Sequence, residues 1–411
     1  MLSVLTATTL PSLILEGTLK DLQISSASYA YPAVPGDVRA GLAIALGPIE
    51  LALSRAAEAG FPAFVLSTCL RIEVAVPTPM DRLDEALTLL FGKVPTPQGS
   101  VRRSGTDAVE HLFRIVAGLE SPIVGEREIL IQFRQAAATA VERGAANGTF
   151  RGLLDAAITT ARSVRDELPV DPQRSMASIA AGLTAPADRV GVLGHGAMGR
   201  SVAEALLALP HRPTVEVYAR LRESIDTKGV IARSLTEAPA ALMTLPAVIS
   251  ATSAKTRLIP ANELADLLAV RSEPLTMIDM AMPPDFCPPA DIAVQYYDID
   301  DLADLSRDHV PRDGADRLVA AAATAFTHKI WAGKRTGSLI ENLFDQADDA
   351  VTEVVDRLAG KLTSPEDRAL LEQAAHTVTR KILHRPVRYL SGDGAGEAAA
   401  VAAAFGIDLD D

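Results

Sequence analysis

Residues 189–207 read RVGVLGHGAMGRSVAEALL, and this stretch decides the fold of the middle of the 411-residue chain. An apolar run leads into a G-x-G-x-x-G pattern at Gly194, Gly196 and Gly199, and a helical period of apolar residues follows. Strand, glycine turn and helix in this order are typical of the first βαβ unit of a dinucleotide-binding domain. Glycines permit the tight turn and let backbone N–H groups at the start of the helix approach a pyrophosphate.

The end of the next strand indicates which dinucleotide fits. The run TVEVYAR ends about 20 residues after the glycine turn, where an NAD site places an acidic residue for the ribose 2′-hydroxyl. Here Ala219 is followed by Arg220, and a cation at this position suits a 2′-phosphate, so we predict NADPH. A fold of this kind without a cofactor is the alternative. The residues predicted to bind NADPH are Gly194, His195, Gly196, Ala197, Met198, Gly199 and Arg220, with His195 contributing its backbone.

The segments on either side of this stretch have different patterns. From residue 188 to 300 strands and helices alternate, which predicts a parallel sheet. Residues 21–100 mix short apolar runs, such as 51–53, with helical stretches, and this is an α+β pattern. A helical period covers residues 105–168. Beyond residue 300 the chain is Ala-rich, and apolar residues at three-and-four spacing over 339–358 predict a helical packing surface.

Composition narrows the class of protein. With 39 basic and 52 acidic residues, the net charge of −13 argues against non-specific nucleic-acid binding, although a local basic face could still hold an RNA. Two cysteines, Cys69 and Cys287, give neither a disulfide framework nor zinc spacing, so we predict a reducing compartment and no metal. The first 21 residues lack a basic start and are interrupted by Pro11, Glu16 and Lys20. We therefore predict no secretion signal, no membrane span and a cytoplasmic location.

A thiol beside an arginine is the main candidate for chemistry. In FVLSTCLRIEV, residues 64–74, Phe64 to Leu66 read as a buried strand that leads to Cys69. Arg71 is two positions further on and would share a face with Cys69 on an extended strand, where its charge would favour the thiolate. A buried structural cysteine is the alternative. Together with an NADPH domain, a reactive thiol predicts acyl transfer to sulfur and hydride reduction of the thioester to an aldehyde.

Several blocks of the sequence resemble the glutamyl-tRNA reductase family. LSTCLRIEV is similar to its S-T-C-N-R-x-E stretch, and HLFRIVAGLESPIVGEREILIQ is similar to its H-L-F-R-V-A-x-G-L-D-S and G-E-x-Q-I-x-x-Q segments. VISATSAKTRLI, MIDMAMPPDF and YYDIDDL are similar to its nucleotide-domain stretches, and KILHRPVRYL resembles its K-L-L-H-x-P. The blocks follow the family order from about residue 21 to 390, which is nearly the whole chain.

The resemblance implies a reaction and a set of site residues. Cys69 would attack the ester carbonyl of glutamyl-tRNA, and NADPH would reduce the resulting thioester to glutamate-1-semialdehyde, the first step of five-carbon tetrapyrrole (5-aminolevulinate) synthesis. The positions that match those holding the glutamyl group are Thr68, Arg71, Ser121, Glu126 and Gln132. His111 matches a histidine important for activity. On a helix it would point away from the apolar stripe that contains Leu112, so we predict that it is not a core histidine; a solvated histidine is the alternative.

The resemblance also implies an architecture. It implies a multi-domain α/β protein with an α+β catalytic domain over residues 1–168 and a Rossmann-type NADPH-binding domain over 169–300. Residues 301–411 would form a long spinal helix and an all-α domain that dimerises the chain. The implied partners are glutamyl-tRNA, a second copy of the chain and a downstream semialdehyde aminotransferase.

Departures from the family pattern leave the substrate open. Leu70 replaces an asparagine and Glu128 a glutamine, so we add Leu70, Glu128 and its neighbour Arg127 to the candidate substrate contacts. Pro284 replaces an arginine, His195 and Ala197 alter the glycine loop, and residues 24–41 lack the family's N-H-K-T-A-P run. A paralogue acting on another aminoacyl-tRNA and a non-catalytic tRNA-binding relative therefore stay as alternatives. Retention of Cys69, the sole plausible nucleophile, favours an active enzyme; Cys287, in a Pro-rich loop, is expected to be incidental.

Overall fold

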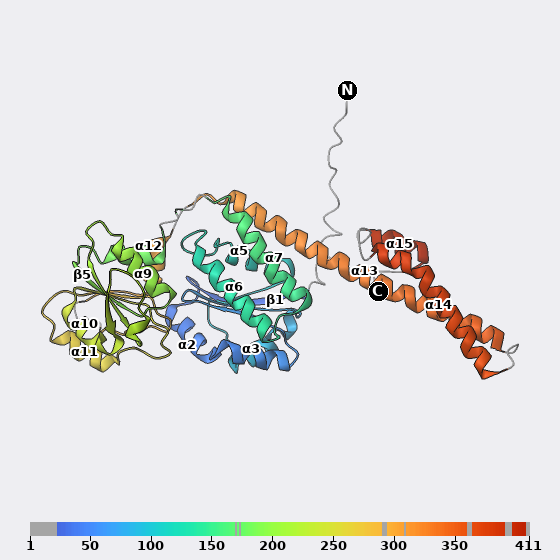
Figure 1. Ribbon diagram of the computed structural model, residues 1–411, viewed down its shortest axis with the longest axis horizontal. Coiled ribbons are helices and arrows are strands. Elements are labelled where there is room, and N and C mark those ends of the chain that lie inside the picture. Colours follow the sequence, from blue (N-terminus) through green and yellow to red (C-terminus); the bar gives the residue numbers. More distant parts are fainter. Residues whose placement is uncertain are drawn as a thin grey trace, which may run out of the picture. The chain divides into compact units, whose positions relative to one another are not determined.

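The computed structural model (Figure 1) describes residues 23–168, 171, 174–289, 294–307, 310–359, 364–390 and 397–407. The segment before residue 23, for which we predict neither a secretion signal nor a membrane span, lies outside these residues. The chain forms two compact units, Met1–Ala323 and Thr324–Asp411. In the described part no single helix is long and apolar enough to cross a membrane, and only the bent pair α2 (Gly36–Leu46) and α3 (Ile49–Glu58) passes that test when taken together.

The first unit begins with an antiparallel sheet of four strands in the order β2-β3-β1-β4. Its strands are β1 (Ser25–Ala30), β2 (Phe64–Ser67), β3 (Arg71–Val76) and β4 (Val101–Ser104). The helices around it are α2, α3, α4 (Leu83–Phe91), α5 (Gly105–Val116), α6 (Arg127–Glu142) and α7 (Gly148–Arg165), with a short 3₁₀ turn η2 (Met80–Arg82). All six residues of β3 are buried, so both faces of the sheet are covered.

Two features of this part differ from the prediction. β1 was not predicted, because its sequence SSASYA has almost no large apolar residue; its serines are buried by the two neighbouring strands and by hydrogen bonds. Ser28, for example, donates a hydrogen bond of 3.0 Å to Glu73. Residues 51–53, treated as an apolar run in an α+β alternation, lie inside α3 instead.

A parallel sheet of six strands forms the second part of this unit, as predicted. Its strands are β5 (Arg189–Leu193), β6 (Thr214–Ala219), β7 (Ile231–Ser234), β8 (Ala247–Ser250), β9 (Thr276–Asp279) and β10 (Gln295–Tyr297). Its helices are α8 (Met176–Leu183), α9 (Ala197–Leu207), α10 (Ala238–Thr244), α11 (Ala261–Ala269) and α12 (Ile299–Ser306), with 3₁₀ turns η3 (Arg222–Ser224) and η4 (Leu235–Glu237). β7 was not predicted from the sequence, because none of its residues is buried.

The strand order fixes where a ligand can bind. The order β10-β9-β8-β5-β6-β7 is the doubly wound arrangement, and chain connections run in opposite directions from β5 and β8. A crevice opens at the carboxyl ends of strands at such a switch point, and dinucleotides bind there. The glycine pattern follows β5 directly, so the sequence motif lies at this crevice.

The second unit is helical. α13 (Asp313–Ala359), the long orange helix in Figure 1, has 47 residues and continues from the first unit into the second. α14 (Pro365–Leu390) and α15 (Ala398–Phe405) complete the unit. Leu339 and Leu343 from α13 pack with Leu390 and Ala402 from the other two helices, which confirms the helical packing surface predicted from the three-and-four spacing.

Candidate functional site

Cys69 lies in the turn between two strands of the antiparallel sheet. β2 ends at Ser67 and β3 begins at Arg71, and the Thr68 amide donates a hydrogen bond of 2.8 Å to the Arg71 carbonyl across the turn. The Thr68 hydroxyl accepts from the amides of Leu70 (3.3 Å) and Arg71 (3.2 Å). The expectation that Cys69 and Arg71 share a face of one strand is therefore wrong, because the chain reverses between them. Thr68 shapes the turn that presents the thiol.

The guanidinium of Arg71 is paired with groups other than the Cys69 thiol. Its side chain is buried, Nη1 donates to Glu73 Oε1 at 3.3 Å, and Nη2 donates to the Glu120 carbonyl oxygen. Glu73 is itself only 1% exposed and also accepts a hydrogen bond from Ser28. A buried ion pair of this kind holds both partners in place, so Arg71 anchors β3 rather than serving as the cation of the thiol.

His111 is a core residue, contrary to the sequence-based prediction. It is 6% exposed, and its Nε2 lies 3.1 Å from Glu73 Oε2. The prediction failed because α5 is buried on most of its circumference, including Ala108 and Ile115, which lie outside the expected stripe. Two of the predicted site residues, Arg71 and His111, thus join Glu73 and Ser28 in a buried network. Glu73 is its centre and was missed, although it stands in the quoted motif.

The surroundings of Cys69 favour the neutral thiol. Burial, and to a smaller extent the Glu126 carboxylate, raises the pKa of Cys69 to about 12, although Arg39 acts in the opposite direction. The residue itself is only partly buried by its exposed area, so a reagent can reach the turn although the sulfur is desolvated. Cys69 and Leu70 both pack on an apolar cluster that includes Ile123, Met176 and Met280. Leu70 is 7% exposed and belongs to this cluster as a buried core residue.

The loop before α6 carries most of the other predicted substrate contacts. Ser121 is buried and donates a hydrogen bond to the Glu126 carboxylate, and burial raises the pKa of Glu126. Glu126, Arg127 and Glu128 line a cavity of about 310 Å³, together with Met198 from the glycine loop. Its described lining residues do not include the candidate nucleophile Cys69 or the other predicted substrate contacts, which are Thr68, Leu70, Arg71, Ser121 and Gln132. The structure therefore brings the acidic loop to the cofactor side of the unit.

A larger cavity of about 1210 Å³ lies at the carboxyl ends of β5, β6 and β8. Its lining includes the predicted cofactor residues Gly194, His195, Gly196, Ala197, Met198 and Arg220, together with Leu221, Ser224, Leu235, Leu258 and the loop 251–255. No acidic residue is among its described lining residues, whereas Arg220 and Lys255 are. A basic rim of this kind suits a phosphorylated ligand.

Each glycine of the motif has a separate steric reason. Gly194 has a φ of +102°, and an added Cβ would lie 2.6 Å from the Ala251 oxygen. A Cβ on Gly199 would lie 2.1 Å from the Gly194 oxygen, so this glycine lets α9 pack closely on the turn. A Cβ on Gly196 would meet no atom within 4 Å, so this position faces open space where a pyrophosphate can approach. The three positions fit a dinucleotide in the way that the motif requires.

The side chains of His195 and Asp285 hold the loops around the cavity in place. The His195 side chain is 2% exposed, and its Nε2 lies 3.0 Å from the Thr227 hydroxyl, so only its backbone serves the cavity. Asp285 is fully buried and accepts hydrogen bonds from Ser250 (2.6 Å) and Thr252 (2.8 Å), which fixes the loop after β8. Sequence reasoning missed Asp285, although it follows Pro284 in the quoted MPPDF. Cys287 is exposed in the same loop region, and the described residues hold no cluster of side chains suited to a metal.

Comparison with known proteins gives the family. Residues 28–168 match the model described as "Glutamyl-tRNAGlu reductase, N-terminal domain", 176–305 match "Shikimate / quinate 5-dehydrogenase", and 314–407 match "Glutamyl-tRNAGlu reductase, dimerisation domain". The glutamyl-tRNA reductase of Rubrobacter xylanophilus is 30% identical over 410 residues, which cover 91% of this chain and 93% of that protein. "Glutamyl-tRNA reductase 2" of Anaeromyxobacter dehalogenans is 28% identical over 94% of this chain and 93% of its own length. A solved structure of the Methanopyrus kandleri glutamyl-tRNA reductase is 23% identical, with a TM-score of 0.47 over 88% of this chain and 94% of that one. The chain belongs to the glutamyl-tRNA reductase family.

Proposed function

We propose that this protein is an NADPH-dependent glutamyl-tRNA reductase that forms glutamate-1-semialdehyde, the first step of five-carbon tetrapyrrole synthesis. One observation carries this proposal beyond family membership. Cys69, the candidate nucleophile, and Met198, in the glycine loop, pack against the same apolar cluster. A thiol and a dinucleotide crevice held on one core suit a reaction in which an acyl group on sulfur is reduced in place.

The chain's own residues account for the acyl-transfer step. The Cys69 sulfur forms a bond to the ester carbonyl carbon, the bond to the ribose oxygen of the tRNA breaks, and the proton of the thiol goes to the leaving hydroxyl in the overall balance. Thr68 holds the turn in shape through its two backbone contacts. The network around Glu73 keeps β3 and α5 in register below the turn. Partial burial of Cys69 limits access of water to the acyl enzyme.

The cofactor site supplies the second step. A reduced nicotinamide dinucleotide held by the glycine-loop residues would supply a hydride to the thioester carbonyl carbon. The bond from that carbon to the Cys69 sulfur breaks, the aldehyde leaves, and the released thiolate takes up a proton. The open position at Gly196 would admit its pyrophosphate to the start of α9. Arg220 is exposed at the end of β6 and would face a 2′-phosphate, which supports NADPH over NADH.

A local basic face supports tRNA as the partner despite the acidic net charge. Arg165 on α7 has a lowered pKa because of burial and because Arg127 and Arg134 of α6 lie near enough to repel its proton. Arginines that repel one another gain when phosphate groups neutralise them. We place the phosphate backbone of the acceptor end on this face of α6 and α7.

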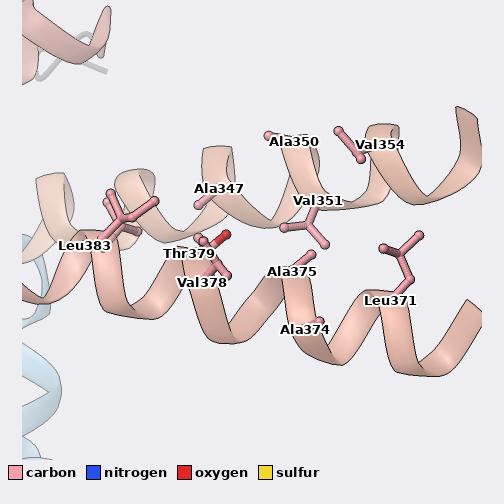
Figure 2. A pocket seen from close by; sticks show the side chains of 11 residues that line it. Ala347, Ala350, Val351, Val354, Leu371, Ala374, Ala375, Val378, Thr379 and Leu383 are labelled. Carbon is pink, nitrogen blue, oxygen red and sulfur yellow. The ribbon is translucent and has the colours of Figure 1, made fainter. Parts of the chain in front are cut away.

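The second unit supports a homodimer. α13 and α14 enclose an almost wholly apolar groove of about 540 Å³ between them (Figure 2). Val354, Val378 and Ile382 on this surface are 45%, 56% and 67% exposed. An exposed apolar surface on a segment that matches a dimerisation domain supports a second copy of the chain as its partner. Docking of an aminotransferase and a cytoplasmic location stay predictions from the sequence.

Of the two substrate-site residues that differ from the family pattern, only one supports a change in the aminoacyl group that is accepted. Leu70 packs in the core, so its replacement of asparagine gives no direct support for a different aminoacyl group. Glu128 lines the 310 Å³ cavity beside Arg127, and its charge helps to raise the pKa of Glu126. The alternative of a paralogue with another aminoacyl-tRNA therefore rests on Glu128.

Turnover of a panel of charged tRNAs tests this function. The purified protein is mixed with glutamyl-tRNA and either NADPH or NADH, and both cofactor oxidation and semialdehyde formation are followed. We expect semialdehyde with glutamyl-tRNA, faster with NADPH, and none with uncharged tRNA or with Cys69→Ser. Cys287→Ser serves as the matched control and should retain activity, because Cys287 is exposed and lines neither of the two cavities of this unit described above. Turnover of another aminoacyl-tRNA in preference to glutamyl-tRNA would establish the paralogue instead.

A further inference from the structure

A buried arginine joins the thiol turn to the nucleotide-binding part of the first unit. Arg39 of α2 is 1% exposed, and its Nη2 donates to the Cys69 carbonyl oxygen at 3.4 Å. The same nitrogen donates to Asp300 Oδ1, and Nη1 lies 3.4 Å from Asp300 Oδ2. Asp300 stands in the first turn of α12, directly after β10 of the parallel sheet. The guanidinium thus contacts both the thiol turn and α12, whose Asp300 is 261 residues from Arg39 in the sequence.

Arg39 is also the cation that acts on the thiol. The charged groups that influence Cys69 come from three elements: Arg39 from α2, Glu126 from the loop before α6, and Glu128 from α6 itself. Both carboxylates disfavour the thiolate, and Arg39 opposes them. Asp300, from α12, pairs with the same guanidinium nitrogen that contacts the Cys69 carbonyl and neutralises part of its charge.

Burying an arginine is costly unless its partners compensate for the lost hydration. Here Asp300, whose side chain is 26% exposed, compensates together with the Val34 carbonyl oxygen, which accepts from Nη1 at 2.5 Å. The positive charge of the buried Arg39 therefore acts on two groups. One is the partly exposed Asp300 carboxylate, and the other is the catalytic turn that carries Cys69.

We infer that Arg39 is a positioning residue for Cys69 and that Asp300 competes with the Cys69 thiolate for its charge. The contact to the Cys69 carbonyl holds the turn, and the strength of the Arg39–Asp300 pair sets how much positive potential remains at the sulfur. Since Asp300 belongs to the nucleotide-binding part, the reactivity of the thiol depends on how firmly that part holds Arg39. The inference rests on the proposed function only in taking Cys69 as the nucleophile.

The two partners of this pair should have opposite effects on the thiol. In a Cys287→Ser background, the rate of alkylation of Cys69 by iodoacetamide is measured between pH 6 and pH 10, a range chosen around the ordinary thiol pKa of about 8.5. Asp300→Asn should accelerate alkylation at neutral pH by about tenfold, the effect of one pKa unit on thiolate content. Arg39→Met should slow it by a similar factor, and Arg39→Lys, which restores the charge, should recover part of the rate.

A neighbouring carboxylate gives the matched control. Asp304 is on the same helix as Asp300 but pairs with Tyr31 and Arg307, so Asp304→Asn should leave the alkylation profile unchanged. Equal profiles for Asp300→Asn, Asp304→Asn and the parent would overturn the inference, as would acceleration by Arg39→Met. If Arg39→Met fails to fold, Asp300→Asn against Asp304→Asn still decides. Alkylation needs neither tRNA nor NADPH, so this result is independent of whether the reductase activity is found.

Discussion

At the turn between β2 and β3, burial sets the protonation state of the thiol, and two carboxylates and one guanidinium modify it. Burial and Glu126 raise the pKa of Cys69, and Arg39 only partly offsets them. The free protein therefore holds a protonated thiol at neutral pH, and the nucleophile has to be activated when the substrate arrives. This arrangement protects a partly buried cysteine from oxidation and alkylation between turnovers, because the thiolate is the reactive form.

The pH dependence of stability should show this raised pKa. The pKa of Cys69 is about 12 in the folded protein and about 8.5 in an unfolded chain. The folded state therefore disfavours the thiolate, and the contribution of Cys69 to stability is present below pH 8.5 and is lost as the pH rises towards 12. Urea unfolding of the parent and of Cys69→Ala at pH 7.5 and pH 9.5 checks this, values chosen on either side of about 8.5. The parent should lose stability relative to the variant at the higher pH. A constant difference would contradict the raised pKa.

Leu70 provides the second test at the scale of one residue. It is 7% exposed in an apolar cluster, and an asparagine there would bury an amide without a partner. Leu70→Asn should lower the free energy of unfolding by about 1–3 kcal/mol and should not raise kcat/KM on glutamyl-tRNA. Leu70→Met keeps the volume and should cost less than about 1.5 kcal/mol. Increased activity of Leu70→Asn would show that this position faces the substrate after all.

At the scale of elements, the glycine turn between β5 and α9 contains one glycine that is needed for packing and another that is needed for ligand binding. Gly199→Ala places a Cβ 2.1 Å from the Gly194 oxygen, so this variant should unfold at a lower temperature. Gly196→Ala meets no protein atom within 4 Å, so it should keep the parent's melting temperature and yet weaken NADPH binding. Thermal melting and fluorescence titration with NADPH measure the two effects. NADPH affinity unchanged in Gly196→Ala would remove the pyrophosphate from this position.

The same elements show what a sequence can predict. The parallel sheet and its glycine turn were predictable because strand, turn and helix are adjacent in the chain and each carries a local pattern. β1 was not, because its small residues are buried only through pairing with β3 and β4. The burial of His111 depends on Glu73 in another element, and the contact of Arg39 with Asp300 depends on a fold that joins distant segments. A pattern along the chain predicts which face of a single helix or strand is buried. The burial of these residues depends instead on contacts with other elements of the fold, which such a pattern does not contain.

At the scale of the whole molecule, the groove of α13 and α14 makes dimerisation testable. Ile382 lines the groove and is 67% exposed, and Leu370 of the same helix is 68% exposed but does not line it. Ile382→Asp should convert a dimer to a monomer, because it would bury a carboxylate in the apolar contact, whereas Leu370→Asp should remain dimeric. Sedimentation velocity at several protein concentrations distinguishes the two. A dimeric Ile382→Asp would move the interface away from this groove.

The most direct measurement of the central claim is trapping of the acyl enzyme. The protein is incubated with tRNA that carries radiolabelled glutamate, without NADPH, then denatured in acid and separated from RNA. We predict label bound to the parent and to Cys287→Ser, released by hydroxylamine as expected of a thioester, and no label on Cys69→Ser or Cys69→Ala. Addition of NADPH before denaturation should move the label from the protein to free glutamate-1-semialdehyde. Label that stays on the protein when Cys69 is replaced, or semialdehyde formed by the Cys69→Ala variant, would contradict a thioester on Cys69.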